Sequence, residues 1–337
     1  MSYVDAPPKA SILIESMRDI GYSLEMALAD VIDNSITAGA RNIHILVDVL
    51  SPDVSIGILD DGSGMTRSEL IDAMRLGSRH PRENRDTSDL GRFGLGLKTA
   101  SFSQCRKLTV AARKGGKTSI ATWDLDHVRD TDQWSLIVPQ NLDGVPFSEQ
   151  LSSDGVLVVW EKLDRAVEQD GSDTARKHFT RRIDEVRQHL ELVFHRFLKR
   201  EGRSEKVVIL LNGRELEPFD PFNASHPATH HGNVETIPIR TSAVRIKMHT
   251  LPHHSKVTRK EWDQYGGPQG YLRSQGFYLY RERRLIVHGT WFGLARQTEL
   301  TKLTRVQIDI PNELDAEWQI DVKKAWARPP LQVRTRL

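Results

Sequence analysis

The stretch MALADVIDNSITAGARNIHILVDV, residues 26–49, has the pattern of a helix followed by a strand. Its first part also carries Asp30, Asp33 and Asn34, three residues of low helix propensity. A segment that must pack against a core therefore holds polar groups as well. The apolar residues that indicate one packed face in each part are Leu24, Leu28, Val31 and Ile32 for the helix, and Ile43, Ile45, Val47 and Val49 for the strand.

Asp30 and Asn34 lie four residues apart, so we expect them to share one face of the helix, while Asp33 points elsewhere. A carboxamide oxygen is a hard ligand that suits Mg²⁺. A neighbouring carboxylate can orient and deprotonate an attacking water molecule. This pair therefore suits a metal–phosphate site, and the alternative is an ordinary polar edge that faces solvent.

A second segment, ILDDGSGM, predicts a strand that ends at Asp60 and Asp61. Gly62 and Gly64 allow the backbone to turn tightly after the strand. An acidic side chain in this position can accept a hydrogen bond from an exocyclic amine. The alternative is a simple Asp-Gly turn.

The third segment is GRFGLGLKTASF, residues 91–102. Its glycines expose backbone N–H groups, a helix is expected to start within it, and Lys98 supplies a positive charge. These are the parts of a phosphate cradle. The spacing of a Walker A loop is absent, and the glycine spacing also differs from a dinucleotide-binding fingerprint.

In this order and at these intervals, the three segments resemble the GHKL ATPases, which include gyrase B, MutL, the ninety-kilodalton heat-shock chaperones, histidine kinases and MORC proteins. The run NSITAGA is most similar to MutL and MORC. The resemblance implies binding of ATP and Mg²⁺, with Asn34 as the metal ligand, Asp60 as the reader of the adenine amino group and Asp30 at the position of the catalytic base. It also assigns nucleotide contacts to Gly62, Gly64, Met65, Gly91, Phe93, Gly94, Leu95, Gly96, Lys98 and Thr99.

Two positions depart from the family pattern. The family has Glu where this chain has Asp30, which is shorter by one methylene, or about 1.5 Å of reach. In GVLVVW, Val156 stands where the family has a threonine hydroxyl. Slow hydrolysis is therefore expected, and a nucleotide-sensing scaffold with little turnover is an alternative.

We predict an α+β protein in which residues 1–170 form a two-layer α/β sandwich ATPase domain and residues 171–337 form a transducer-like α/β domain. A long amphipathic helix is expected near residues 174–199, and a loop at residues 220–236. GFYLYRERRLI and WQIDVKKAW resemble transducer segments of MutL and MORC. That resemblance implies a phosphate-sensing lysine, Lys324 with Lys323 next, although both could be surface charges.

The amino-acid composition excludes several classes of protein and of site. The chain has 337 residues and a net charge of +2, which gives no support for a polycation. Its single cysteine, Cys105, excludes disulfide frameworks and cysteine zinc sites, and favours a reducing cytoplasm. We recognise no signal peptide and no run of about 18 apolar residues, so no membrane partner is expected.

The resemblance implies an ATP-dependent clamp or switch that dimerises when ATP binds, with residues 1–9 as a crossing arm and DNA as the cargo. Bacterial MORC/MutL-like ATPases are associated with antiphage or restriction-like defence and with nuclease or helicase partners. The alternatives are a MutL-like mismatch-repair ATPase, the nucleotide-sensing scaffold and a chaperone.

Overall fold

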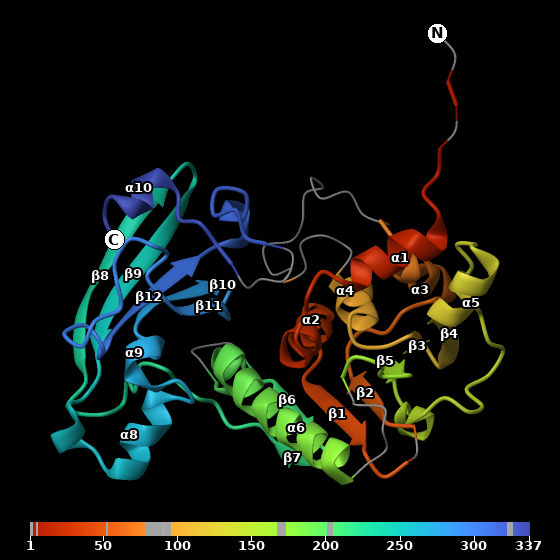
Figure 1. Ribbon diagram of the computed structural model, residues 1–337, viewed down its shortest axis with the longest axis horizontal. Helices are drawn as coiled ribbons and strands as arrows, with labels where there is room; N and C mark the ends of the chain where they lie inside the picture. The colour runs from red at the N-terminus through yellow and green to blue at the C-terminus, as the bar shows by residue number, and fades with distance from the viewer. Residues whose placement is uncertain are drawn as a thin grey trace. The chain divides into compact units, whose positions relative to one another are not determined.

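The stretch at residues 26–49 forms most of α2 (Leu24–Thr37) and the strand β1 (Asn42–Asp48), which pairs antiparallel with β2 (Ser55–Asp60). The computed structural model describes residues 3–4, 6–51, 53–77, 90, 96–166, 173–200, 205–321 and 326–337 (Figure 1). The chain divides into a first unit (residues 1–84, 91–190 and 207–216) and a second unit (85–90, 191–206 and 217–337).

The first unit is built on a seven-stranded sheet with the order β4-β3-β5-β2-β1-β6-β7. Ile43 and Ile45 are fully buried on one face of β1, as the alternating pattern predicts. β3 and β4 form a hairpin, with Gly115 and Gly116 at its turn in left-handed conformations. Its remaining strands are β3 (Lys107–Lys114), β4 (Lys117–Asp124), β5 (Gly155–Glu161), β6 (Val208–Leu211) and β7 (Arg214–Glu215).

Helices cover one face of this sheet, and α2 packs against both β2 and α4 (Figure 1). Gly21 lies between α1 and α2, and its left-handed φ of 82° accompanies the break between the two helices. Contacts on several sides bury α2 almost completely, including Asp30 and Asp33, so the idea of a solvent-facing polar edge is wrong except at Asn34. The other helices are α1 (Ala10–Arg18), α3 (Arg67–Met74), α4 (Gly96–Phe102), α5 (Leu125–Thr131) and α6 (Asp173–Val193).

The first unit extends further along the chain than a division at residue 170 implies. β6 pairs in parallel with β1, so that Asn42 lies opposite Val208 and Ile45 opposite Leu211. The hairpin of β6 and β7 therefore completes the first sheet, although about 160 residues separate it from β1 in sequence. The assignment of the two halves as ATPase and transducer domains stays a prediction.

The second unit contains a five-stranded sheet with the order β11-β10-β12-β9-β8. β10 and β12 are parallel, and the other neighbours are antiparallel. Together with the first sheet and its helices, this sheet confirms the α+β class. The elements are α7 (His195–Leu198), β8 (His230–Ile239), β9 (Ser242–Thr250), α8 (Arg259–Gly266), α9 (Gly270–Ser274), β10 (Gly276–Arg281), β11 (Arg284–Thr290), β12 (Thr304–Ile310) and α10 (Leu331–Arg334).

Two expectations for this part of the chain need correction. The predicted loop at 220–236 overlaps β8, an edge strand whose residues are largely polar and exposed. Such a sequence lacks the apolar alternation of a half-buried strand, and edge strands commonly carry polar residues and proline, here Pro238. The predicted long helix also stops at Val193, and α7 follows as a separate short helix.

No described helix is both long and apolar enough to cross a membrane.

We expect Thr66→Ala to lower the free energy of unfolding by about 1 kcal/mol, because it removes the N-cap of α3. Thr66 and Glu69 form a capping box, in which the Glu69 carboxylate accepts from the Thr66 backbone N–H at 2.7 Å. Urea unfolding of Thr66→Ala beside the exposed neighbour variant Arg67→Ala measures the difference. Equal midpoints for the two variants would contradict a capping role.

Candidate nucleotide-binding site

Asp60 lies at the end of β2 with only 7% of its surface exposed. Its Oδ1 accepts hydrogen bonds from the backbone N–H groups of Gly62 at 3.0 Å and Val156 at 3.2 Å. Its Oδ2 accepts from the Ser35 hydroxyl at 2.7 Å. Burial raises the pKa of this carboxyl, and the three hydrogen bonds oppose the shift. An ionised carboxylate offers about four acceptor positions, so these three donors leave one for a ligand amine.

The glycines after Asp60 allow a close approach of backbones. Gly64 has a φ of 61°, and a Cβ at this position would lie 1.9 Å from the carbonyl oxygen of Arg113. A Cβ at Gly62 would lie 3.0 Å from Asp60 Oδ1. The turn is also tied to α2, because the Ser63 N–H donates to the Ala38 carbonyl at 3.0 Å. The second sequence segment is thus fixed against the end of the first.

The neighbouring carboxylate, Asp61, has a different task. Its Oδ1 accepts from the backbone N–H groups of Arg41 at 2.7 Å and Asn42 at 2.9 Å, and its Oδ2 accepts from the Asn42 carboxamide at 2.7 Å. These bonds lower its pKa, and they hold the start of β1. Asp61 therefore anchors β1, while the hydrogen bond of a simple Asp-Gly turn, from the Gly62 N–H, is accepted by Asp60.

Asp30 is the buried carboxylate of α2, with 5% of its surface exposed. Its Oδ2 accepts a hydrogen bond from the Tyr22 hydroxyl at 2.9 Å. A Cβ at Gly96 would lie 3.8 Å from the same oxygen, so the start of α4 comes next to this carboxylate. The first and third sequence segments therefore meet at Asp30.

Asn34 lies one turn beyond Asp30 on α2 and is exposed. No side-chain hydrogen bond joins Asn34 to another residue that the structure describes. Its carboxamide oxygen suits Mg²⁺, which usually binds through one or two protein oxygens together with phosphates and water. No cluster of three or more His, Cys, Asp or Glu side chains occurs in the described parts of the chain, so a dedicated all-protein metal cage is not present there.

Lys98 and Thr99 are described at the start of α4, and both are buried. The Lys98 ammonium donates to the carbonyl of Ala73 at 2.8 Å, near the end of α3, where a positive charge is favourable. The Thr99 hydroxyl donates to the Gly96 carbonyl at 3.4 Å. Their contacts with phosphate stay predictions, as does the contact of half-buried Met65 with the base.

Several predicted site residues lie outside the described residues, and their roles stay predictions. They are Gly91, Phe93, Gly94, Leu95, Lys323 and Lys324.

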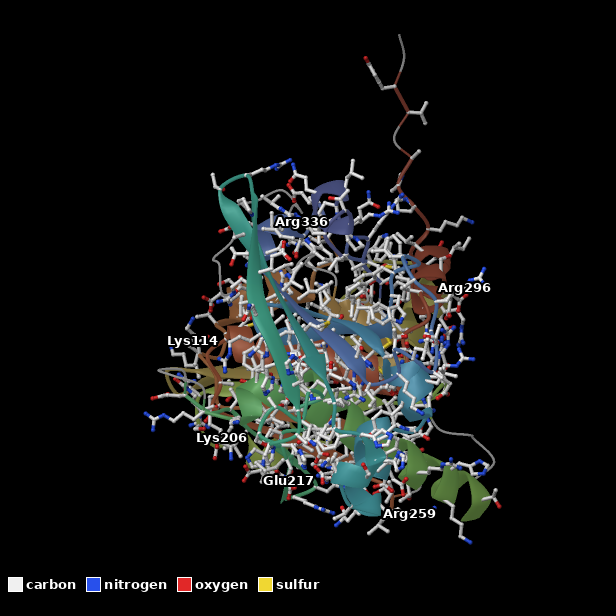
Figure 2. The ribbon with its side chains drawn as sticks, turned by 90° about the vertical axis from the view of Figure 1, so that its left-hand side faces the viewer. Lys114, Lys206, Glu217, Arg259, Arg296 and Arg336 are labelled. Atoms are coloured by element: carbon white, nitrogen blue, oxygen red, sulfur yellow. The ribbon has the colours of Figure 1, made fainter. Side chains whose placement is uncertain are left out.

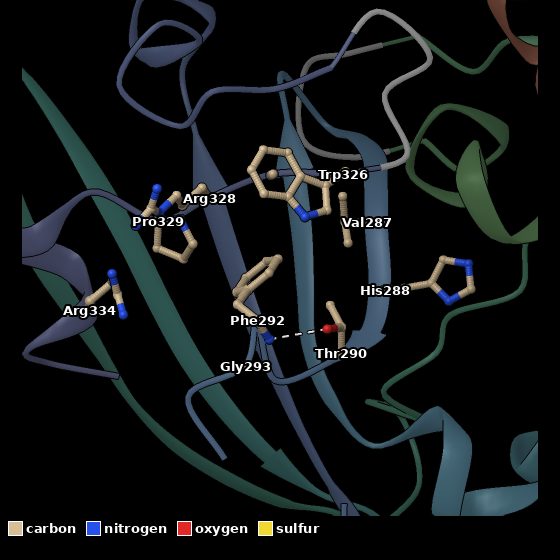
Figure 3. Close-up of a pocket in the computed structure, with 10 residues that line it drawn as sticks. Val287, His288, Thr290, Phe292, Gly293, Trp326, Arg328, Pro329 and Arg334 are labelled. Atoms are coloured by element: carbon tan, nitrogen blue, oxygen red, sulfur yellow. Dashed lines mark hydrogen bonds between the residues drawn. The ribbon is translucent and has the colours of Figure 1, made fainter. Parts of the chain in front are cut away.

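The segment that follows the predicted phosphate-sensing lysines lines a cavity of about 600 Å³ in the second unit. Figure 3 shows Trp326, Phe292 and Thr290 around it, with the Phe292 backbone N–H donating to the Thr290 hydroxyl at 3.1 Å. Trp326 is half exposed. Nothing in this cavity resembles the carboxylate and glycine arrangement of the first unit.

Sequence reasoning did not identify Ser35, Tyr22 or the Val156 N–H as parts of the site. Ser35 directly follows Asn34, the predicted metal ligand, but it is buried where Asn34 is exposed, and no pattern in the sequence points to its contact with Asp60. Tyr22 contacts Asp30 from before the helix, and no local pattern points to it. The backbone contribution of Val156 depends on strand register, which places this residue opposite Asp60.

Comparison with known proteins agrees with this geometry. Residues 22–154 match the family of histidine kinase-, DNA gyrase B- and HSP90-like ATPases. ATPase morc-1 of Caenorhabditis elegans is 31% identical over 129 residues, which cover 36% of this chain and 15% of that protein. Chaperone protein HtpG of Rickettsia prowazekii (strain Madrid E) is 32% identical over 104 residues, which cover 28% of this chain and 17% of that protein.

The chain thus spans only about one sixth of the length of these relatives. Within it, residues 22–154 form an ATPase domain of the GHKL superfamily, as the sequence resemblance implied. A MORC protein is among its relatives.

Proposed function

We propose that this protein binds ATP with Mg²⁺ and hydrolyses it. The observation that carries the proposal is the meeting of the three sequence segments in the first unit. Ser35 of the first segment donates to Asp60 of the second, and Gly96 of the third lies beside Asp30 of the first. Carboxylates, a carboxamide and a glycine-rich helix start are thereby brought into one site.

Each group has a separate role in the proposed reaction. Asp60 accepts a hydrogen bond from the adenine amino group at its remaining acceptor position. Asp30, held by the Tyr22 hydroxyl, orients the attacking water and accepts its proton. Asn34 supplies an oxygen ligand to Mg²⁺, and the bound ion would neutralise phosphate charge.

The wider function is proposed from the resemblance. ATP binding draws Lys324 to the γ-phosphate and closes a homodimer, and hydrolysis reopens it. The cargo is DNA, and the process is bacterial antiphage or restriction-like defence with nuclease or helicase partners. A MutL-like mismatch-repair role is the alternative within the same class, and the similarity to HtpG keeps a chaperone as a third.

A nucleotide-sensing scaffold with little turnover is the second candidate, and two observations favour it. Asp30 is one methylene shorter than glutamate, and Val156 presents an apolar side chain opposite Asp60. Tight ATP binding with negligible turnover, with and without DNA, would select this candidate.

Asp60→Asn is expected to weaken ATP binding about 10- to 100-fold. The carboxamide of asparagine places donor hydrogens where the adenine amine also donates, so the hydrogen bond between them is lost. A hydrogen bond to a charged group contributes about 1.5–3 kcal/mol, which corresponds to this range. Titration calorimetry of the full chain with ATP and Mg²⁺ measures this. Asp61→Asn is the matched control, since an asparagine there can still accept from Arg41 and Asn42. Unchanged ATP affinity in Asp60→Asn would refute the assignment of the adenine site.

A further inference from the structure

The sheet of the second unit has two chemically different faces. Along β9 and β12, Val244, Ile246 and Ile308 point into an apolar core. The intervening residues lie on the opposite face, where strand register places Arg245 against Asp309 and Lys247 against Gln307. The polar face therefore carries charged groups on two central strands.

A cavity of about 1030 Å³ lies over this polar face. That volume is at the upper end of the range for small-molecule sites and accommodates a nucleotide. Five arginines and lysines and three carboxylates line it, so the lining has an excess of two positive charges. The basic residues are Arg196, Lys199, Arg245, Lys247 and Arg283.

The three carboxylates of the lining are all engaged by the protein. Asp309 pairs with Arg196 and accepts from the Gln307 carboxamide at 2.5 Å. Asp220 accepts from two backbone N–H groups, those of Phe222 and Ala224, at 3.0 Å each. Glu282 accepts from the Asn312 backbone N–H at 3.2 Å. These acids are therefore already occupied by hydrogen-bond donors of the second unit.

Two of the basic residues in the lining, Arg245 and Lys247, are not engaged in the way these carboxylates are. Neither forms an ion pair or a side-chain hydrogen bond with any residue in the described ranges, and Arg245 is exposed while Lys247 is half-buried. Arg196, by contrast, is paired with Asp309 and lies over the Tyr280 ring at 3.5 Å. Arg245 and Lys247 thus leave uncompensated positive charge in the cavity, which favours an anionic ligand.

His249 adds a second kind of group to the lining. Its side chain is only 2% exposed, and its ring stacks on Phe222 with centroids 4.4 Å apart. Its Nδ1 lies 3.0 Å from Nδ1 of His231, whose Nε2 lies 3.2 Å from the Ala224 carbonyl oxygen. Because a carbonyl only accepts, His231 donates through Nε2 and accepts at Nδ1, so His249 donates through Nδ1.

This arrangement leaves Nε2 of His249 as an acceptor. The atom is buried and has no hydrogen-bond partner among the described residues. Burial, aided by Lys247, lowers the pKa of His249 to about 4, and the ring is therefore neutral at pH 7. A side-chain interaction of hydrogen-bond type with Gln307 opposes this shift, but no hydrogen bond of normal geometry reaches Nε2. A buried acceptor without a donor calls for a partner from outside.

We propose that this cavity binds a phosphorylated ligand that also carries a hydrogen-bond donor, as a nucleotide or the end of a nucleic-acid strand does. Arg245 and Lys247 hold the phosphate, and the Nε2 lone pair of His249 accepts from a base N–H or a sugar hydroxyl. The site is separate from the proposed ATP site, because all its lining residues belong to the second unit. It therefore does not depend on ATP hydrolysis.

The first test is binding of a fluorescent, 5′-phosphorylated oligothymidylate to the full chain, followed by anisotropy. Thymine lacks the amino group that Asp60 is proposed to read. The double variant Arg245→Gln, Lys247→Gln is expected to bind about 100-fold more weakly, at about tenfold for each lost charged hydrogen bond. The control is Arg259→Gln, a cation on α8 whose side chain is 94% exposed and which lies at the outside in Figure 2.

A second variant tests the donor requirement. His249→Phe keeps a ring for stacking on Phe222 but removes the acceptor. We expect about fivefold weaker binding of the oligothymidylate, the value of one neutral hydrogen bond, and unchanged binding of inorganic pyrophosphate. An equal loss for both ligands would overturn the proposed role of His249, and thermal unfolding of the variant checks that the fold is retained.

Competition separates the two sources of the ligand. Displacement by thymidine monophosphate at similar concentration supports a free nucleotide, and displacement by a blunt DNA duplex alone supports a nucleic-acid end. The proposal is overturned if the wild type binds none of these probes or if the double variant binds like Arg259→Gln. The proposal is also overturned if Asp60→Asn, and not the double variant, abolishes oligothymidylate binding, since the ligand would then occupy the first unit. If the wild type fails only to bind ATP, the proposed function fails and the proposal for this cavity is unaffected.

Discussion

Asp30→Asn is expected to lower Mg²⁺-dependent ATP turnover by roughly 10²- to 10⁴-fold and to leave ATP affinity within about twofold of the wild type. The range is the usual contribution of a positioned general base. Asparagine keeps the shape of the side chain and can still accept from the Tyr22 hydroxyl, so the surroundings of α2 are preserved. Steady-state phosphate release, with calorimetry for binding, measures the two quantities separately.

Glu25→Gln is the matched control on the same helix, because Glu25 lies at the N-terminal turn of α2, away from Asp30 and Gly96. It should leave turnover unchanged. Equal turnover in wild type and Asp30→Asn would show that the base is another group. A loss of turnover together with a loss of ATP affinity would instead point to a binding role for Asp30.

Asp30→Glu addresses the departure from the family pattern with the same assay. The longer side chain would advance the carboxylate by about 1.5 Å, and reaction rates are sensitive to displacements of this size. Even a Cβ added at Gly96 would lie 3.8 Å from Asp30 Oδ2, an ordinary contact distance, and Gly96 has none, so the start of α4 leaves some space for the additional methylene. Faster hydrolysis in this variant would show that reach limits the natural enzyme.

Local sequence patterns predicted much of the first unit. The helical stripe of α2 and the alternation in β1 were both recognisable, because each depends on residues close in sequence. The pairing of β6 with β1 was not recognisable. Parallel pairing over such a sequence distance depends on the whole sheet, and it leaves no mark in either strand.

The candidate site shows the same limit. Asp30, Asn34 and Asp60 could be predicted because carboxylates and a carboxamide stand at unusual positions in a helix and at a strand end. The groups that hold them could not. Ser35 contacts Asp60 only because α2 crosses the end of β2, and the Val156 N–H reaches Asp60 only through the register of β5. These contacts arise from tertiary packing.

Gly64→Ala is expected to destabilise the protein by about 2–5 kcal/mol. The left-handed φ of 61° alone costs an alanine about 1–2 kcal/mol. The added Cβ would also lie 1.9 Å from the Arg113 carbonyl oxygen, a separation that backbone or side chain must relieve by moving. Overpacking of this kind typically costs another 1–3 kcal/mol, roughly. Urea unfolding of the full chain measures the sum.

The Arg113 carbonyl cannot move freely, because Arg113 lies in β3 opposite Gly155 of β5. Gly155 is itself close to the backbone of Asp60, since a Cβ at Gly155 would lie 2.0 Å from the Asp60 carbonyl oxygen. Relief at Gly64 would therefore shift the strands that position Asp60, so ATP binding should weaken together with stability. Gly116→Ala is the control: its φ is 78°, but no atom lies within 4 Å of the new Cβ, so only the conformational cost of about 1–2 kcal/mol remains. If the two variants unfold at the same urea concentration, the close approach at Gly64 does not constrain the site. If Gly64→Ala alone is strongly destabilised and binds ATP poorly, this glycine is required because the turn after β2 meets the backbone of β3 close to Asp60, the carboxylate proposed to read the base.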